Sequence, residues 1–96
     1  MFLIGRQQNR VDLPLLHESI SREHAAIVLD EQRGTLLVDL GSTSGTKLNG
    51  QVLQEHIGMP LKDGDEIVFG ASTRLYKVKT DYSKFRKALE ERQQQL

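Results

Sequence analysis

The sequence predicts an all-β fold, a sandwich or barrel of short antiparallel strands followed by one C-terminal α-helix. Short apolar runs recur at close spacing, and clusters of Gly, Asp, Asn and Ser separate them, as is typical of strands joined by tight turns. Apolar residues at helical spacing are nearly absent before residue 80. Because 96 residues are close to the lower limit for one stable core, we expect one domain at residues 1–79 and a helical extension at 80–96.

The clearest strands lie in the first half of the chain. Residues 2–4 form one apolar run, and residues 25–29 and 35–40 form two more, which the Gly-containing turn at residues 31–34 joins. We expect this hairpin to form the centre of the core.

The second half shows shorter strand signals, at residues 47–48, 52–53, 59–61, 66–69 and 75–79. A turn rich in Asp and Gly at residues 62–65 precedes the fourth of them. Alternation places Ile67 and Phe69 on one face of this strand, and it turns Tyr76 and Val78 of the last strand inward.

Residues 80–96 differ in character from the rest. Tyr82, Phe85, Ala88 and Leu89 fall at helical spacing among Lys, Arg, Glu and Gln, which predicts a helix with a narrow apolar stripe. Three outcomes stay open: docking on the sandwich, packing against a partner helix, or a frayed polar helix that leads into a downstream region.

Charge and composition exclude several classes of function. The chain has 13 basic and 13 acidic residues, so no net charge attracts nucleic acid or an anionic membrane. It has no cysteine, which excludes disulfides and thiolate metal sites and weakly favours a reducing compartment. Its apolar runs are far shorter than the roughly 18 residues of a membrane span. We therefore expect a soluble intracellular chain that binds neither nucleic acid nor membrane directly.

Three polar clusters carry the chemistry that the sequence indicates. They are Gly5-Arg6, the Ser-Arg-Glu-His run at residues 21–24, and the Gly- and hydroxyl-rich run at 41–46 with Asn49-Gly50 after it. Each lies at or beyond a strand end, where a sandwich collects its loops at one pole. We expect the three clusters to converge.

The residue types in these clusters suit a phosphate ester. A phosphate carries about −1.5 to −2 charge and three acceptor oxygens, so it is best bound by guanidinium, hydroxyl and backbone donors. Gly41 and Gly45 would let the backbone turn sharply and bring N–H groups near the ligand. The candidate phosphate-binding residues are Arg6, Ser21, Arg22 and Thr43.

These blocks resemble the forkhead-associated (FHA) domain, whose pattern is Gly-Arg, Ser-Arg-x-His, Ser-x-Asn-Gly-Thr and Asn-Gly. Order and spacing match over most of residues 2–79. The resemblance implies an eleven-stranded β-sandwich that binds phosphothreonine peptides, with Arg6, Ser21 and Arg22 on the phosphate and Thr43 and Ser44 near the peptide backbone. It also implies that the threonine methyl group of the ligand enters a small apolar niche.

Four further residues are interpreted as structural support for the site. His24 braces its loop by hydrogen bonding, as the resemblance also implies, and Asn49 stabilises its own turn. Gly5 and Gly45 are interpreted as positions where the backbone requires a residue without a side chain, and not as ligand contacts.

Peptide selectivity is assigned to a further segment. Residues 70–74, with Arg74, form the loop expected to contact the peptide downstream of the phosphate, and Lys47 is expected to border the site. Simple surface charges are the alternative interpretation of Arg74 and Lys47. Residues 69–76 resemble a nuclear, splicing-associated member of the family that regulates a phosphatase. This implies a nuclear address, with a cytoplasmic one as the alternative.

Two departures from the family pattern matter. Ser44 stands where the family commonly has Asn, and its hydroxyl cannot make the same pair of amide contacts to a peptide. Only four residues precede Gly5, although the family has a further strand before this one. Either the chain is truncated or a sheet edge is left open, and an unpaired edge would invite association with another chain.

Other functions fit the residues less well. His24 near Ser21 or Asp39 has the ingredients of a hydrolase triad, but a loop brace explains it better. His17 and His56 are interpreted as solvated loop residues, and nothing pairs them with carboxylates at metal-ligand spacing. Residues 41–47 fail the P-loop pattern, because three residues separate the glycines and Thr precedes Lys.

We therefore expect a phosphothreonine-dependent adaptor module with no enzymatic activity, no metal and no cofactor. Its partner would be a phosphothreonine in an extended segment of another protein. The competing hypothesis is a scaffold that binds a folded partner through a sheet face or an open edge without phosphate.

Overall fold

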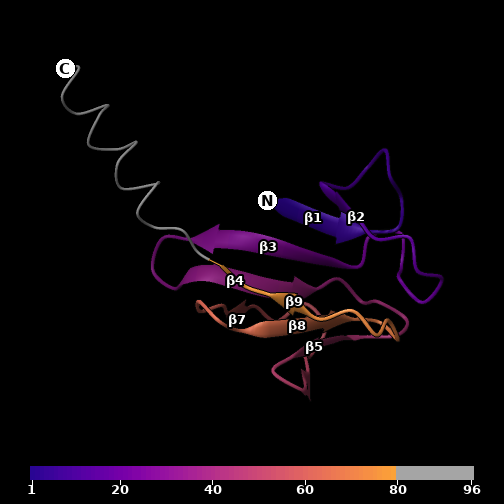
Figure 1. The fold of residues 1–96 in the computed structure, drawn as a ribbon. Coiled ribbons are helices and arrows are strands. Elements are labelled where there is room, and N and C mark those ends of the chain that lie inside the picture. The colour runs from indigo at the N-terminus through magenta and orange to yellow at the C-terminus, as the bar shows by residue number, and fades with distance from the viewer. Residues whose placement is uncertain (80–96) are drawn as a thin grey trace.

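Two β-sheets pack face to face in the computed structural model, which describes residues 1–79 (Figure 1). The first sheet has the strand order β2-β1-β3-β4-β7, with bounds Leu13–Pro14, Phe2–Gly5, Ala25–Asp30, Gly34–Asp39 and Met59–Pro60. The second has the order β6-β5-β8-β9, with bounds Gln51–Val52, Thr46–Leu48, Glu66–Phe69 and Tyr76–Lys77. The predicted all-β class is confirmed.

The β3–β4 hairpin, which the sequence predicted, is the longest strand pairing within residues 1–79. Its antiparallel register runs from Ala25 opposite Asp39 to Asp30 opposite Gly34. The Oδ1 atom of Asp30 accepts the N–H groups of Gln32 and Arg33, and Gly34 takes a φ of 79° to complete the turn. Turn chemistry therefore fixes the register of the two central strands.

One pairing departs from the antiparallel expectation. The two-residue strand β2 was not predicted, and it pairs in parallel with β1, with Ile4 opposite Leu13. The first sheet is therefore mixed. Pro14 has no N–H to donate to a neighbouring strand. It is tolerated in β2 because this strand lies at the edge of the sheet.

The core lies between the sheets and takes side chains from both. Ile67 and Phe69, predicted to share a face, are 3% and 1% exposed. Tyr76 and Val78 pack against this core, as their alternation predicted. The buried apolar cluster consists of Ile4, Ile20, Ala25, Leu37, Leu48, Leu53, Leu61, Ile67 and Phe69.

Residues 1–79 contain nine strands, whereas the family resemblance implied eleven. The predicted helix at residues 80–96 lies outside the described residues. No helix in the part of the chain that the structure describes is long and apolar enough to cross a membrane.

Candidate functional site

Strand pairing brings the three polar clusters to one pole of the sandwich. The end of β1 lies beside the start of β3, since Ile4 pairs with Ala25, and Ala25 pairs in turn with Asp39 at the end of β4. In the second sheet, Thr46 at the start of β5 pairs with Phe69 at the end of β8. Four segments therefore meet at the same end of the sandwich: the one after β1, the one before β3, the loop from β4 to β5, and the one after β8.

Arg6 is held against the loop that carries Ser21 and Arg22. Its backbone N–H donates to the carbonyl of Ser21 at 3.0 Å, and its Nε donates to the carbonyl of Ile20 at 2.9 Å. The next residue, Gln7, donates its N–H to the carbonyl of Arg22 at 3.2 Å. The structure thus brings the segments of Arg6 and Arg22 together, and both side chains are exposed to a ligand.

Gly5 is required by this close approach of the two segments. A Cβ atom on Gly5 would lie 2.1 Å from the carbonyl oxygen of Arg22. This distance is far inside van der Waals contact, and the obstacle is backbone that cannot rotate away. The absence of a side chain at residue 5 therefore lets the chain of Arg6 lie beside that of Arg22.

Ser21 also connects to the third cluster. Thr43 donates its backbone N–H to the Oγ of Ser21 at 3.1 Å. Because Oγ acts as the acceptor in this bond, the hydroxyl hydrogen of Ser21 can donate to an anion. Thr43 and Ser44 are exposed beside it.

His24 links two of the loops from the interior. Its ring is fully buried, its Nδ1 accepts the N–H of Ser21 at 3.0 Å, and its Nε2 lies 2.8 Å from the carbonyl of Gly45. Since Nδ1 must carry a lone pair and a carbonyl only accepts, the geometry assigns the neutral Nε2–H tautomer. The rings of His24 and Phe69 pack in a T-shaped arrangement with their centroids 5.9 Å apart. Its contacts agree with the predicted loop brace.

Asp39 organises the loop between β4 and β5. Its Oδ1 accepts the hydroxyl groups of Ser42 at 2.5 Å and Thr46 at 2.6 Å, and its Oδ2 accepts the N–H groups of Gly41 and Ser42. Burial of Asp39 opposes ionisation, but the hydrogen bonds from Ser42 and Thr46 outweigh burial and hold its pKa below the ordinary value. The loop that presents Thr43 is therefore built around a buried carboxylate.

A cavity of about 460 Å³ adjoins the site, between the loops at residues 15–20 and 70–75. Ile20, Phe69 and Tyr76 form apolar walls, and His17 and Arg74 line it with polar groups. Ile20 directly precedes Ser21, so the cavity lies close to the loop that carries Ser21 and Arg22.

A hydrogen-bonded contact joins the two loops of this cavity. The Oγ of Ser19 accepts the N–H of Ala71 at 2.9 Å and lies 2.7 Å from the Nδ1 of His17. A Cβ atom on Gly70 would lie 2.7 Å from that Oγ, and Gly70 has a φ of 61°. The contact therefore depends on a residue without a side chain at position 70.

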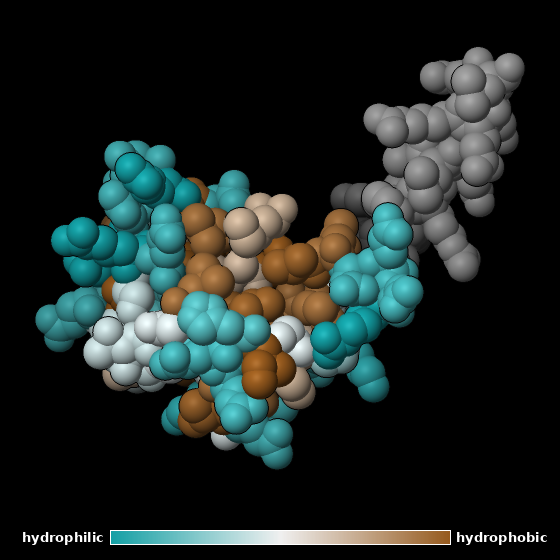
Figure 2. All heavy atoms as spheres, turned by 180° about the vertical axis from the view of Figure 1, so that it is seen from behind, coloured by the Kyte–Doolittle hydropathy of each residue, from teal (hydrophilic) through white to brown (hydrophobic). Residues whose placement is uncertain are grey.

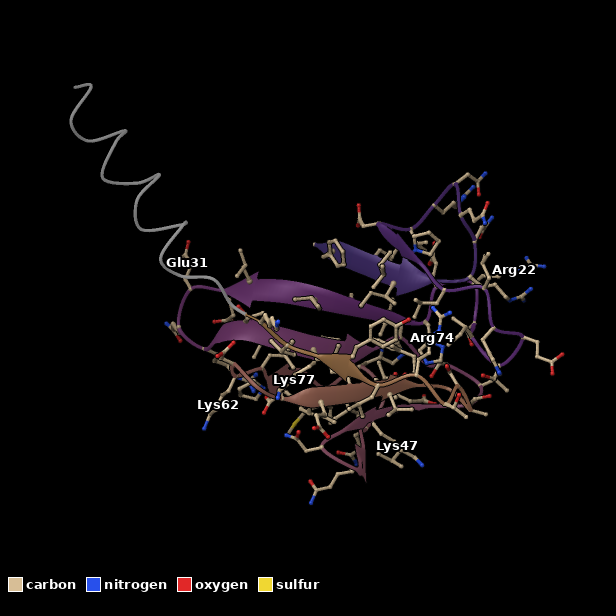
Figure 3. The ribbon with its side chains drawn as sticks, in the orientation of Figure 1. Arg22, Glu31, Lys47, Lys62, Arg74 and Lys77 are labelled. Carbon is tan, nitrogen blue, oxygen red and sulfur yellow. The ribbon has the colours of Figure 1, made fainter. Side chains whose placement is uncertain are left out.

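The structure places two of the predicted residues away from this cluster. Lys47 lies on β5 between the buried residues Thr46 and Leu48, so its side chain projects outward from the second sheet (Figure 3). Asn49 follows β5 at the other end from Gly45, where it accepts the N–H of Glu66 and donates to Asp65. In the same view, Arg22 projects from the loop end of the molecule (Figure 3).

Sequence reasoning missed several residues that shape the site. It did not identify the hydroxyl groups of Ser42 and Thr46 as partners of Asp39. The spacing of Asp with Gly and Ser two and three residues later is an Asx-turn signal that could have indicated part of this loop. His17 was interpreted as a solvated residue, and no sequence signal indicated its contact with Ser19.

Residues 2–70 match the family model described as "FHA domain". The protein phosphatase 1 regulatory inhibitor subunit PPP1R8 homolog of Arabidopsis thaliana is 38% identical over 74 residues, which cover 77% of this chain and 20% of that protein. The human nuclear inhibitor of protein phosphatase 1 is 38% identical over 76 residues, covering 78% of this chain and 22% of that protein. The chain therefore spans about a fifth of the length of these relatives.

A solved structure shares both fold and sequence. The N-terminal FHA domain of Rad53p from Saccharomyces cerevisiae, in complex with a phosphothreonine peptide, is 29% identical with a TM-score of 0.70. The likeness covers 91% of this chain and 72% of that domain's chain.

Proposed function

Because this chain belongs to the FHA domain family, we propose that it is a phosphothreonine-dependent peptide-binding module that acts as an adaptor and catalyses no reaction. One observation carries the proposal. Arg6 and Thr43 are both hydrogen-bonded to the residues at positions 20–21, so a guanidinium, a hydroxyl and a third loop surround one point of the surface. This is the donor set that a dianionic phosphate requires.

In the proposed complex, the guanidinium groups of Arg6 and Arg22 neutralise the phosphate. The hydroxyl of Ser21, whose oxygen already accepts the N–H of Thr43, donates its hydrogen to a phosphate oxygen. Thr43 adds a further polar group at the edge of the proposed phosphate site. Charge-assisted hydrogen bonds contribute about 1.5–3 kcal/mol each. After the cost of ordering a flexible peptide, an affinity in the micromolar range, about −8 kcal/mol, is expected.

The peptide backbone would lie along the loop between β4 and β5, with Ser44 beside it. Ser44 is exposed next to Thr43, which suits this role. Its single hydroxyl supplies one donor and an acceptor, fewer groups than the amide that the family commonly places there.

We assign peptide selectivity to the cavity between residues 15–20 and 70–75. Its apolar walls would hold an apolar side chain downstream of the phosphothreonine, and Arg74 would favour an acidic neighbour. Lys47 faces outward from β5 and would contribute only if the peptide continued around that side of the molecule.

The cellular context is proposed from the relatives. The human nuclear inhibitor of protein phosphatase 1 and the mouse Smad nuclear-interacting protein 1 are among the relatives that carry "nuclear" in their names. We propose a nuclear adaptor in splicing or in phosphatase regulation. A fluorescent fusion of the full chain that stayed in the cytoplasm would contradict the nuclear part of this proposal.

Titration with matched peptides, with and without the phosphate on threonine, tests the function. The wild type should bind only the phosphorylated peptide, and Arg22→Ala should weaken that binding at least about tenfold, equivalent to about 1.4 kcal/mol. Lys62→Ala removes one positive charge at the other end of the molecule and is the matched control (Figure 3). Higher salt should weaken binding, because exposed charges contribute to it.

Equal affinity for both peptides would overturn the proposal. It would favour the phosphate-independent scaffold instead, for which the edge strand β9 is the supporting feature.

A further inference from the structure

At the end of the sandwich that carries the phosphate site, the loops lie in the same order as the strands of the first sheet. Arg6 follows β1, Ser21 lies in the segment before β3, residues 40–45 follow β4, and Glu55 and His56 lie in the segment before β7. Because neighbouring strands are about 4.8 Å apart, the segment before β7 lies about 14 Å from Arg6. An extended peptide covers this distance with about four residues.

The segment with Glu55 and His56 is held against the loop between β4 and β5. Glu55 forms an isolated β-bridge with Asp39, and the N–H of His56 donates to the carbonyl of Asp39 at 2.8 Å. A Cβ atom on Gly41 would lie 3.4 Å from the Nε2 of His56 and 3.9 Å from the Oε2 of Glu55. Gly41 in turn is at most about 7 Å from Thr43, since two residues separate them along the chain. Both side chains therefore border the loop that presents Thr43.

The polar groups of these two side chains take no part in holding the fold together. Within residues 1–79, the carboxylate of Glu55 and the ring nitrogens of His56 have no hydrogen-bond or ion-pair partner, and both residues are exposed. His56 has a φ of 62°, a left-handed conformation that is uncommon for a residue with a side chain. Strained backbone of this kind is concentrated where proteins contact ligands. The segment thus presents a free negative charge beside the phosphate site.

The cavity between residues 15–20 and 70–75 lies on the other side of the phosphate site. Leu15, one of its lining residues, follows β2, which is at the opposite edge of the first sheet from β7. On the face seen in Figure 2, hydrophilic residues gather at the loop end of the molecule, at the left, and apolar residues gather across the middle. A peptide bound through its phosphate would therefore extend toward the cavity in one direction and toward Glu55 in the other.

We propose that Glu55 selects a basic side chain, Lys or Arg, about two to four residues upstream of the phosphothreonine. This inference rests on the proposed phosphothreonine binding and adds a second specificity contact to it. The cavity is assigned to downstream residues, so the segment before β7 faces the upstream ones. An ammonium or guanidinium group would give the carboxylate of Glu55 the partner that it lacks within residues 1–79. An acidic side chain at the same place would be repelled, so the contact discriminates by charge.

Calorimetric titration with phosphothreonine peptides tests the preference. In an otherwise constant peptide of Ala and Gly, the residue two, three or four positions before the phosphothreonine is Arg, Ala or Glu. At one of these positions the wild type should bind the Arg peptide about three- to fivefold more tightly than the Ala peptide, the scale of an exposed ion pair. It should bind the Glu peptide more weakly than either. Equal affinities at all three positions would overturn the proposal.

Two variants assign the preference to Glu55. Glu55→Gln should bind the Arg, Ala and Glu peptides alike, and Glu55→Lys should reverse their order. Both should keep the wild-type Tm, because Glu55 contacts Asp39 through its backbone. Glu31→Gln removes the same charge at the other end of the molecule and should keep the wild-type preference (Figure 3). A preference for Arg that survives in Glu55→Gln would show that another group is responsible and would overturn the proposal.

Unphosphorylated copies of the same peptides separate this inference from the proposed function. Phosphate-dependent binding that ignores the upstream charge would remove the contact at Glu55 and leave the proposed function intact. Equal binding of phosphorylated and unphosphorylated peptides would overturn the proposed function, and the upstream contact with it.

Discussion

Thr43 donates its backbone N–H to the Oγ of Ser21 at 3.1 Å, across a separation of 22 residues. This bond fixes the loop between β4 and β5 against the loop before β3. A phosphate that binds at this point therefore meets polar groups already in position, and less affinity is lost to ordering the protein.

Replacing Ser21 should weaken phosphopeptide binding more than it weakens the fold. Ser21→Ala removes the hydroxyl proposed to contact the phosphate and the acceptor for Thr43 N–H, so we expect a loss of affinity of about tenfold, or about 1.4 kcal/mol. Calorimetric titration measures it. Ser21→Thr keeps the hydroxyl and should retain most of the affinity. If both variants bind like the wild type, Ser21 does not contact the ligand.

Gly5→Ala should affect stability and binding together. Its Cβ would lie 2.1 Å from the carbonyl oxygen of Arg22, so the segment of Arg22 must shift, at a cost of about 1–3 kcal/mol or more. Gly34→Ala is the matched control: it introduces strain at a φ of 79° but has no atom within 4 Å of the new Cβ. Both variants should unfold at lower denaturant, and only Gly5→Ala should lose affinity for the phosphopeptide.

His24→Phe should loosen the loops of the site while keeping the packing of a ring against Phe69. It leaves the N–H of Ser21 without its acceptor, which costs about 1–3 kcal/mol when the group is buried. The carbonyl of Gly45 loses one of two donors and keeps the N–H of Gly70. Denaturant unfolding measures the loss. Arg22→Ala gives the contrast, because its exposed side chain should affect binding and leave the free energy of unfolding nearly unchanged. Wild-type stability of His24→Phe would rule out the brace.

Asp39 should make the domain sensitive to acid. Burial opposes its ionisation, but hydrogen bonds from Ser42 and Thr46 outweigh burial and hold the pKa of folded Asp39 below the ordinary value of 3.8. The stabilisation is therefore present above pH 3.8 and is lost as the pH falls through the lower pKa of the folded state. The free energy of unfolding of the wild type should decrease as the pH is lowered from 3.8 through the pKa of folded Asp39.

Asp39→Asn isolates this contribution. It should cost about 1.5–3 kcal/mol at neutral pH and flatten the dependence of stability on pH below 4, whereas Glu31→Gln on the exposed hairpin turn should keep the wild-type slope. A residual slope is expected from Asp65, whose pKa is lowered chiefly by its hydrogen bond from the backbone of Lys62. An unchanged slope in Asp39→Asn would show that the carboxylate is not the acid-sensitive group.

The local sequence pattern was sufficient to predict the strands that have clear alternation of apolar residues or are joined by clear turn residues. The hairpin of residues 25–40 and the inward direction of Ile67 and Phe69 were predicted from the sequence and are confirmed. Strand β2 was not predicted, because two residues carry no period and Pro14 argues against a strand. Its parallel pairing depends on the path of the loop that precedes it, which the sequence pattern does not describe.

The sequence by itself determined the chemical groups of this protein: two arginines, several hydroxyls, a histidine and the glycines that would allow close turns, in the order typical of one family. Only the tertiary structure decided that they meet. The register of β1, β3 and β4 places three distant segments at one pole, and the bonds Arg6–Ile20, Ser21–Thr43 and His24–Gly45 then hold them together. These contacts join residues 14 to 22 positions apart, and no periodicity along the chain encodes a distance between such residues.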